Sequence, residues 1–96
     1  MKKNGLSYFT NNSWILVEDN NKAKKIFKFK NFVEAFSWMT AVALSAEKLD
    51  HHPDWTNVYN TVTVILSTHD HGTITEKDSS LAKIMDNNFD KYNKKN

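Results

Sequence analysis

Residues 24–49, KKIFKFKNFVEAFSWMTAVALSAEKL, contain the change of hydrophobic spacing that decides the fold. In the first part, Phe27 and Phe29 alternate with lysines, which is the spacing of a half-buried β-strand. From Asn31 onward the apolar residues recur every three or four positions, as they do in an amphipathic helix. A side-chain acceptor at Asn31 with Glu34 three residues later is a capping-box pattern, which predicts that the helix begins here.

The predicted helix ends near Asp50 and is expected to bury one stripe of side chains. The stripe has three- and four-residue spacing and comprises Phe32, Phe36, Met39, Ala43, Ala46 and Leu49. His52 precedes Pro53 and is therefore biased away from helical geometry. The adjacent residues His51 and His52 are thus expected where the helix stops.

Strands are predicted on both sides of this helix. Residues 13–18 predict a strand that pairs with residues 24–30 through an Asn- and Asp-rich turn at residues 19–21. Residues 57–68 alternate throughout and predict one long strand, whose valine-rich side is expected to face the helix. A short edge strand is expected around residues 73–74.

A second helix start is predicted at residues 75–78, TEKD, because a threonine and an acidic residue three positions later can cap it. Apolar residues follow at helical spacing: Leu81, Ile84, Met85, Phe89 and Tyr92. The order of elements predicts an α+β domain, with an antiparallel sheet of about four strands and helices packed on one face. The 96 residues are expected to form one domain over 1–96, with frayed tails over 1–4 and 91–96.

The composition excludes several classes of function. The chain has no cysteine, which rules out disulfides, thiolate metal sites and a cysteine nucleophile. Its two glycines build neither a phosphate-binding loop nor a nucleophile elbow. No signal peptide is visible, and no stretch approaches the ~18 apolar residues that span a bilayer. We therefore expect a cytoplasmic protein with no membrane contact.

The basic residues do not predict nucleic-acid binding. All thirteen are lysines, and lysine lacks the guanidinium fork that reads phosphates and guanine edges. Five of them cluster at Lys22, Lys24, Lys25, Lys28 and Lys30, and we expect these to solvate the outer face of a strand. Direct contact with nucleic acid is therefore not expected.

The densest group of reactive side chains lies in residues 47–55, EKLDHHPDW. Two imidazoles beside carboxylates can donate and accept protons near neutral pH. Glu47 or Asp50 can hold one ring in a chosen tautomer, and Trp55 offers a flat face to a planar heterocycle. The alternative is a helix end stabilised by imidazolium, but a tandem pair next to proline and flanked by acids favours function.

A second group, residues 67–71, STHDH, follows the predicted long strand. The hydroxyls of Ser67 and Thr68 can donate to a polar ligand, and His69 is expected to project from the half-polar face of the strand. A metal site is the alternative, because His69 and His71 share one face of an extended strand and could join the histidine pair around zinc or iron. Adjacent histidines usually point in different directions, which argues against that alternative.

Taken together, these residues resemble the signature of the pterin-4a-carbinolamine dehydratase family. The signature is an acidic residue, His-His-Pro, an aromatic residue, a spaced histidine and a later aspartate, matched here by Glu47, His51, His52, Pro53, Tyr59, His69 and Asp78. The similarity runs from about Trp14 to Phe89. The family usually has a fuller helix before the tryptophan, and His71 is an additional histidine in the loop.

The resemblance implies a lyase that dehydrates 4a-hydroxytetrahydrobiopterin to quinonoid dihydrobiopterin and so recycles tetrahydrobiopterin for aromatic amino-acid hydroxylases. Such a reaction needs an acid and a base but no metal and no cofactor, since the pterin is the substrate. By resemblance, the catalytic residues are His51, His52 and His69, and Asp78 orients a histidine. The implied substrate-binding residues are Glu47, Asp50, Trp55, Ser67, Thr68 and Asp70.

The resemblance also implies partners. A homo-oligomer, either a dimer or a tetramer, is expected. Some members of the family act as dimerisation cofactors of a homeodomain transcription factor, which gives a second hypothesis, a protein-binding module. That role needs a surface helix and not the histidines.

Overall fold

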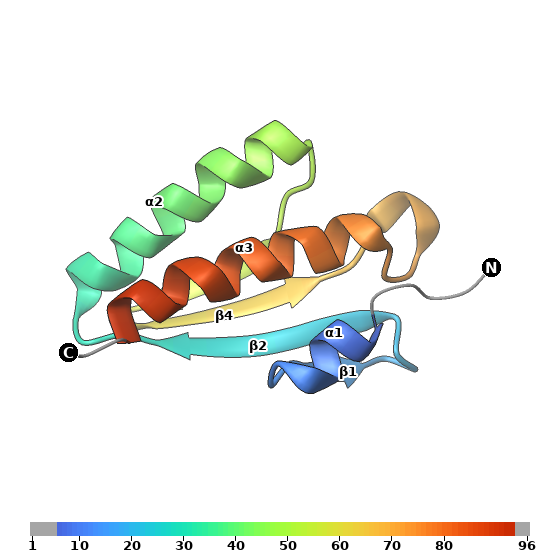
Figure 1. Cartoon of the computed structure of the whole chain (residues 1–96), viewed down its shortest axis with the longest axis horizontal. Coiled ribbons are helices and arrows are strands. Elements are labelled where there is room, and N and C mark those ends of the chain that lie inside the picture. The colour runs from blue at the N-terminus through green and yellow to red at the C-terminus, as the bar shows by residue number, and fades with distance from the viewer. Residues whose placement is uncertain (1–5, 94–96) are drawn as a thin grey trace.

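Four antiparallel strands form one sheet in the order β1-β2-β4-β3. The structure is a computed structural model and describes residues 6–93. The elements are α1 (Leu6–Asn11), β1 (Ile15–Val17), β2 (Lys22–Lys28), α2 (Phe32–Leu49), β3 (Asp54–Val58), β4 (Thr61–Leu66), the 3₁₀ turn η1 (His69–His71) and α3 (Glu76–Asn93). Helices α2 and α3 lie on the same side of the sheet (Figure 1). The predicted α+β fold is confirmed.

The sheet has one face toward the helices and one face toward solvent. On the helix side, Phe27 is paired with Val62, and both are fully buried. On the other side, the neighbouring residue Ile26 is 53% exposed. The alternation of Phe27 and Phe29 with lysines therefore predicted the correct inward face, but the strand begins and ends two residues earlier than the predicted range 24–30.

The prediction of one long strand over residues 57–68 is wrong. The segment belongs to a hairpin, with β3 and β4 joined by a turn at Tyr59 and Asn60. Tyr59 adopts φ 52°, and the side-chain amide of Asn57 donates to the backbone oxygen of Tyr59 at 3.1 Å. The alternation continues through the turn in the sequence, so periodicity did not reveal it. Val58 is consequently 74% exposed, although it was expected to face the helix.

The start of α2 is as predicted, but its buried face is only partly so: Ala46 is buried and Met39 and Leu49 pack against the core as expected, whereas the other half of the predicted stripe is exposed. The side chain of Asn31 accepts the backbone N–H of Glu34 at 2.9 Å. The buried residues are Ala35, Trp38, Val42 and Ala46, whereas Phe32, Phe36 and Ala43 are exposed. Trp38 determines this orientation, because it is fully buried and its ring N–H donates to Met85 O of α3 at 3.1 Å.

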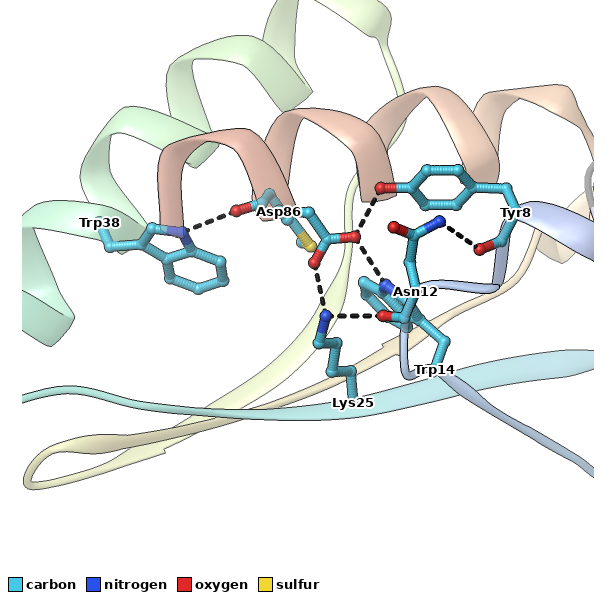
Figure 2. A network of polar contacts seen from close by, with 7 residues as sticks. Tyr8, Asn12, Trp14, Lys25, Trp38 and Asp86 are labelled. Carbon is cyan, nitrogen blue, oxygen red and sulfur yellow. Dashed lines mark hydrogen bonds and ion pairs between the residues drawn. The ribbon is translucent and has the colours of Figure 1, made fainter. Parts of the chain in front are cut away.

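A polar network around Asp86 ties α1 and β2 to α3. Figure 2 shows Tyr8, Trp14 and Lys25 converging on the Asp86 carboxylate. The Lys25 Nζ lies 2.7 Å from Asp86 Oδ1 and also donates to Asn12 O at 2.9 Å. The expectation that Lys25 solvates an outer face is therefore wrong: its side chain is 17% exposed and lies on the side of β2 that faces the helices.

Three smaller features differ from the expectations. Helix α1 was not predicted. The expected edge strand around residues 73–74 is reduced to one bridge between Thr68 and Thr73. Helix α3 continues to Asn93, so the predicted C-terminal tail over 91–96 begins too early. Residues 94–96 of that tail, and the whole predicted N-terminal tail over 1–4, lie outside the described residues. Among the helices of residues 6–93, none has the length and apolar character to cross a membrane.

Candidate active site

A tight turn at the end of α2 fixes the position of His51. Asp50 follows the helix in the left-handed conformation, with φ 55° and ψ 42°. Its backbone N–H donates to Glu47 O at 3.1 Å, and the N–H of His51 donates to Ala46 O at 3.1 Å. These two bonds form a Schellman motif, which ends the helix and reverses the chain. The predicted helix end near Asp50 is confirmed.

The pairing of β3 with β4 brings the histidine pair to the residues that follow β4. Asp54 is paired with Ile65 in this antiparallel ladder. Residues that precede Asp54 therefore lie beside residues that follow Ile65, because antiparallel partners run in opposite chain directions. His51 and Thr68 are each three residues beyond this pair. The turn after α2 therefore meets the junction between β4 and η1.

Asp78, in the first turn of α3, joins these two segments. Its side chain is fully buried. Oδ1 lies 2.6 Å from His51 Nε2, whereas Oδ2 accepts from Thr68 Oγ1 at 2.8 Å and from the backbone N–H of Thr75 at 2.9 Å. The last bond is the predicted helix cap of residues 75–78. Three donors give the buried carboxylate the compensation that loss of hydration requires.

The contact with Asp78 selects one tautomer of His51. The carboxylate accepts, so Nε2 of the imidazole carries the hydrogen and donates it. In the neutral ring, Nδ1 then holds the lone pair and can take a proton from a ligand. His51 is 8% exposed, so the ring is held in place and its remaining contact with the outside is narrow. The resemblance implies that Asp78 orients a histidine, and such a role requires a direct contact like the one between Asp78 Oδ1 and His51 Nε2.

His52 has a different environment from its neighbour. Its Nε2 lies 2.9 Å from Glu47 Oε1. The two side chains are 60% and 80% exposed, in contrast to the buried pair of His51 and Asp78. The expected divergence of the adjacent histidines is therefore observed. An exposed imidazole beside a surface carboxylate is accessible to a ligand, and its proposed role in catalysis stays a prediction.

His69 begins η1 and is exposed, as are Asp70 and His71, so the expectation that His69 and His71 lie on an extended strand is wrong. His69 directly follows Thr68, whose hydroxyl donates to the carboxylate that holds His51. His69 therefore belongs to the same end of the sheet as the histidine pair. Over residues 6–93, no group of three or more histidine, cysteine, aspartate or glutamate side chains is arranged to hold a metal ion.

The remaining predicted site residues lie around this end of the sheet in different settings. Asp50 is exposed in the helix cap, and Ser67 is half-buried between β4 and η1. The ring of Trp55 packs beside Trp38, with 6.1 Å between the ring centroids, so part of its surface is used by the core. Substrate contacts stay predictions for Glu47, Asp50, Trp55, Ser67, Thr68 and Asp70.

From the sequence, Thr75 was predicted only to cap the helix. In the structure its hydroxyl lies 2.6 Å from the hydroxyl of Thr68, which in turn donates to Asp78. The only sequence signal for this contact is the threonine three residues before Asp78, which marks a helix start. In the same segment, Thr73 Oγ1 is a buried side-chain atom without a hydrogen-bond partner in the described part of the chain.

The fold and the site define a class of protein, an α+β domain with a buried carboxylate–imidazole pair suited to acid–base chemistry. Comparison of this chain with known proteins identifies the family within that class. The chain matches the family described as "Pterin 4 alpha carbinolamine dehydratase" over residues 3–88. The chain therefore belongs to the pterin-4-alpha-carbinolamine dehydratase family, a family of enzymes.

Two relatives and one solved structure illustrate the similarity. Proteins named provisionally as pterin-4-alpha-carbinolamine dehydratases are 53% identical in Prochlorococcus marinus, over 90% of each chain, and 57% identical in Mesorhizobium japonicum, over 79% of this chain and 78% of that one. The crystal structure of a "transcriptional coactivator/pterin dehydratase" from Brucella melitensis superimposes with a TM-score of 0.83 at 38% identity. That match covers 92% of this chain and 96% of the other.

Proposed function

We propose that this protein dehydrates 4a-hydroxytetrahydrobiopterin to quinonoid dihydrobiopterin and water, and so takes part in the recycling of tetrahydrobiopterin. Membership of the dehydratase family supports the substrate class. The proposal includes a cytoplasmic location and requires no metal and no separate cofactor. The observation that carries it is the contact of 2.6 Å between His51 Nε2 and the buried carboxylate of Asp78.

The reaction needs one acid and one base. The bond between C4a and its hydroxyl oxygen breaks, an acid protonates the departing oxygen to give water, and a base takes the hydrogen from N5 as the C4a–N5 double bond forms. His51 is suited to proton exchange because Asp78 orients the ring through Nε2 and leaves Nδ1 as the nitrogen that exchanges a proton. His52 and His69 are exposed at the same end of the sheet and supply further donors or acceptors.

The test is the decay of chemically generated 4a-hydroxytetrahydrobiopterin, with the uncatalysed rate subtracted. The wild type is expected to accelerate it, and His69→Ala is expected to lower kcat/KM by about 100-fold, the lower range for loss of an acid or base. His71→Ala is the matched control, because His71 is exposed in the same turn and has no assigned role.

The outcomes separate the hypotheses. A wild type that does not accelerate the decay would remove the enzyme proposal. Equal rates for His69→Ala and the wild type would remove His69 from the mechanism. Activity that a chelator abolishes and zinc restores would favour the metal-site alternative over metal-free acid–base chemistry.

We also propose that the protein forms a homo-oligomer through the outer face of α2. This face exposes large apolar side chains: Phe32 (46%), Val33 (70%), Phe36 (54%) and Leu44 (69%). Several large exposed apolar side chains on one helix are typical of an interface. Phe36 and Leu44 lie four residues on either side of Thr40. Two antiparallel copies crossing at Thr40 would therefore place Phe36 against the partner subunit's Leu44, which is a self-complementary arrangement.

Sedimentation velocity tests the oligomer. We expect the wild type to sediment as a dimer or tetramer and Phe36→Glu to shift to the monomer. Ile26→Glu is the control, because Ile26 is 53% exposed on the opposite side of the sheet. A monomeric wild type, or Ile26→Glu dissociating the oligomer while Phe36→Glu does not, would contradict this interface.

The second candidate function is a protein-binding module that acts as a dimerisation cofactor of a transcription factor. The similar Brucella melitensis protein is named a transcriptional coactivator as well as a pterin dehydratase, which is the observation that favours it. The two functions depend on different residues. A partner that co-purifies with His69→Ala but not with Phe36→Glu would support the binding role, and an active protein without any co-purifying partner would count against it.

A further inference from the structure

A chain of hydrogen bonds in the candidate active site ends on His51. Lys77 N lies 3.3 Å from Thr75 Oγ1, and Thr75 Oγ1 lies 2.6 Å from Thr68 Oγ1. Thr68 Oγ1 lies 2.8 Å from Asp78 Oδ2, and Asp78 Oδ1 lies 2.6 Å from His51 Nε2. Each hydroxyl has one hydrogen, so the direction of donation follows from what the Asp78 end of the chain requires.

The Asp78 end requires the hydrogens to point toward Asp78, and the Lys77 end is compatible with that direction. At one end the backbone N–H of Lys77 donates, so Thr75 Oγ1 accepts. At the other end an ionised carboxylate only accepts, so Thr68 gives its hydrogen to Asp78. Thr68 must then accept the hydrogen of Thr75, because its own is already used. Each bond in such a chain polarises and strengthens the next.

Hydrogen-bond donors surround the carboxylate of Asp78. Besides His51 and Thr68, it accepts the backbone N–H of Thr75 at 2.9 Å. A protonated Asp78 would have to donate either to Thr68 or to His51, and donation to Thr68 would reverse the direction of the whole chain.

We propose that Thr75 is a positioning residue, which acts through Thr68 to hold Asp78 as the acceptor for the Nε2–H of His51. His51 is thereby kept in the tautomer in which Nδ1 is the nitrogen that exchanges a proton with the substrate. The step with substrate rests on the proposed dehydratase function. The tautomer of His51 does not depend on that proposed function, and it can be measured without substrate.

The first experiment is ¹⁵N NMR of the His51 ring in the full chain. The wild type is expected to show a protonated Nε2 and an unprotonated Nδ1. Thr68→Val removes the donor to Asp78 with little change of shape, and the population of the other tautomer should then rise. Thr75→Val should cause a smaller shift in the same direction, and Thr75→Ser, which retains a hydroxyl, should restore the wild-type spectrum.

The second experiment is a double-mutant cycle on kcat. Thr68→Val is expected to lower kcat by about tenfold, as loss of a group that orients a functional histidine does, and Thr75→Val by about threefold. In the Thr68→Val background, Thr75→Val should have no further effect, because Thr75 acts through Thr68. A purely structural role for Thr75 as a helix cap would lower stability equally in both backgrounds.

Thr73→Val is the matched control. It removes a hydroxyl from the same segment, and that hydroxyl has no hydrogen-bond partner within residues 6–93. It should change neither the His51 spectrum nor kcat. The proposal fails if the His51 tautomer is the same in wild type and Thr68→Val, or if Thr75→Val lowers kcat as much in the Thr68→Val background as in the wild type. An inactive wild type with the expected tautomers would contradict the proposed function and leave the positioning chain standing.

Discussion

At the scale of single residues, Asp50 combines a structural position with a predicted role in binding. Its left-handed backbone closes the helix cap that positions His51. Glycine adopts this conformation without a steric penalty, whereas a β-branched residue does not. An acidic side chain at a helix C-terminus is also unfavourable, because it meets the negative end of the helix dipole.

Asp50→Gly is therefore expected to preserve the free energy of unfolding or to raise it by up to about 1 kcal/mol. Asp50→Val should lower it by roughly 1 kcal/mol or more. Urea unfolding measures both effects. If Asp50 also binds the pterin, KM rises in Asp50→Gly although the fold is intact. A large loss of stability in Asp50→Gly would contradict the account of the cap.

Two residues of the site show what the sequence did and did not predict. A contact between Asp78 and one of the histidines was expected through the family signature, and the structure identifies that histidine as His51, 27 positions away. The link from Thr75 through Thr68 to Asp78 was not expected, because the hydrogen of a hydroxyl has no fixed direction until both neighbours of the hydroxyl are known in space. Sequence spacing carries no such information.

At the scale of secondary-structure elements, the ion pair of Lys25 and Asp86 fixes β2 against α3. Both side chains are mostly buried, at 17% and 13% exposure, and Asp86 also accepts from Tyr8 and Trp14. Removal of one partner leaves a buried charge without full compensation, which costs about 3 kcal/mol.

Lys25→Met is therefore expected to lower the free energy of unfolding by about 3 kcal/mol, as measured by urea denaturation. The matched control is Lys22→Met on the same strand. Lys22 pairs with Glu18 at 3.5 Å on the surface, where such a pair contributes less than about 0.5 kcal/mol. Equal losses for the two variants would contradict the assignment of Lys25 to the interior.

The contacts between elements explain which elements could be predicted from the sequence and which could not. The cap at Asn31 is local, so four residues sufficed to predict it. The buried face of α2 is not local: stripes through Phe36 and through Trp38 have the same period, and only contact with α3 selects Trp38. The hairpin at Tyr59 was missed because alternation continued across it, and the inward position of Lys25 depends on a partner 61 residues away.

At the scale of the whole molecule, Tyr8 makes the free energy of unfolding depend on pH in the alkaline range. Burial raises the pKa of Tyr8 above its ordinary value of 10.0, and the hydrogen bond to Asp86 and the charges of Asp86 and Asp90 raise it further. The folded protein thus binds the phenolic proton more tightly than the unfolded chain. The resulting stabilisation is fully present below pH 10.0 and is lost as the pH rises toward the pKa of the folded state.

Tyr8→Phe should remove this dependence. We expect the difference in free energy of unfolding between wild type and Tyr8→Phe to be constant below about pH 9 and to shrink above pH 10.0. Urea unfolding at a series of pH values measures the difference. Tyr59→Phe is the control, since Tyr59 is 63% exposed on the far hairpin turn. A difference that is independent of pH would contradict the environment described for Tyr8.

The whole fold serves to bring the end of α2, the end of β4 and the start of α3 to one place, where Asp78 holds His51. The most direct test is the rate of 4a-hydroxytetrahydrobiopterin dehydration by the wild type and by His51→Ala. We predict that the wild type accelerates the reaction and that His51→Ala loses about 100-fold or more of kcat, the range for removal of an acid or base. A wild type without activity, or a His51→Ala variant with the wild-type kcat, would contradict the account.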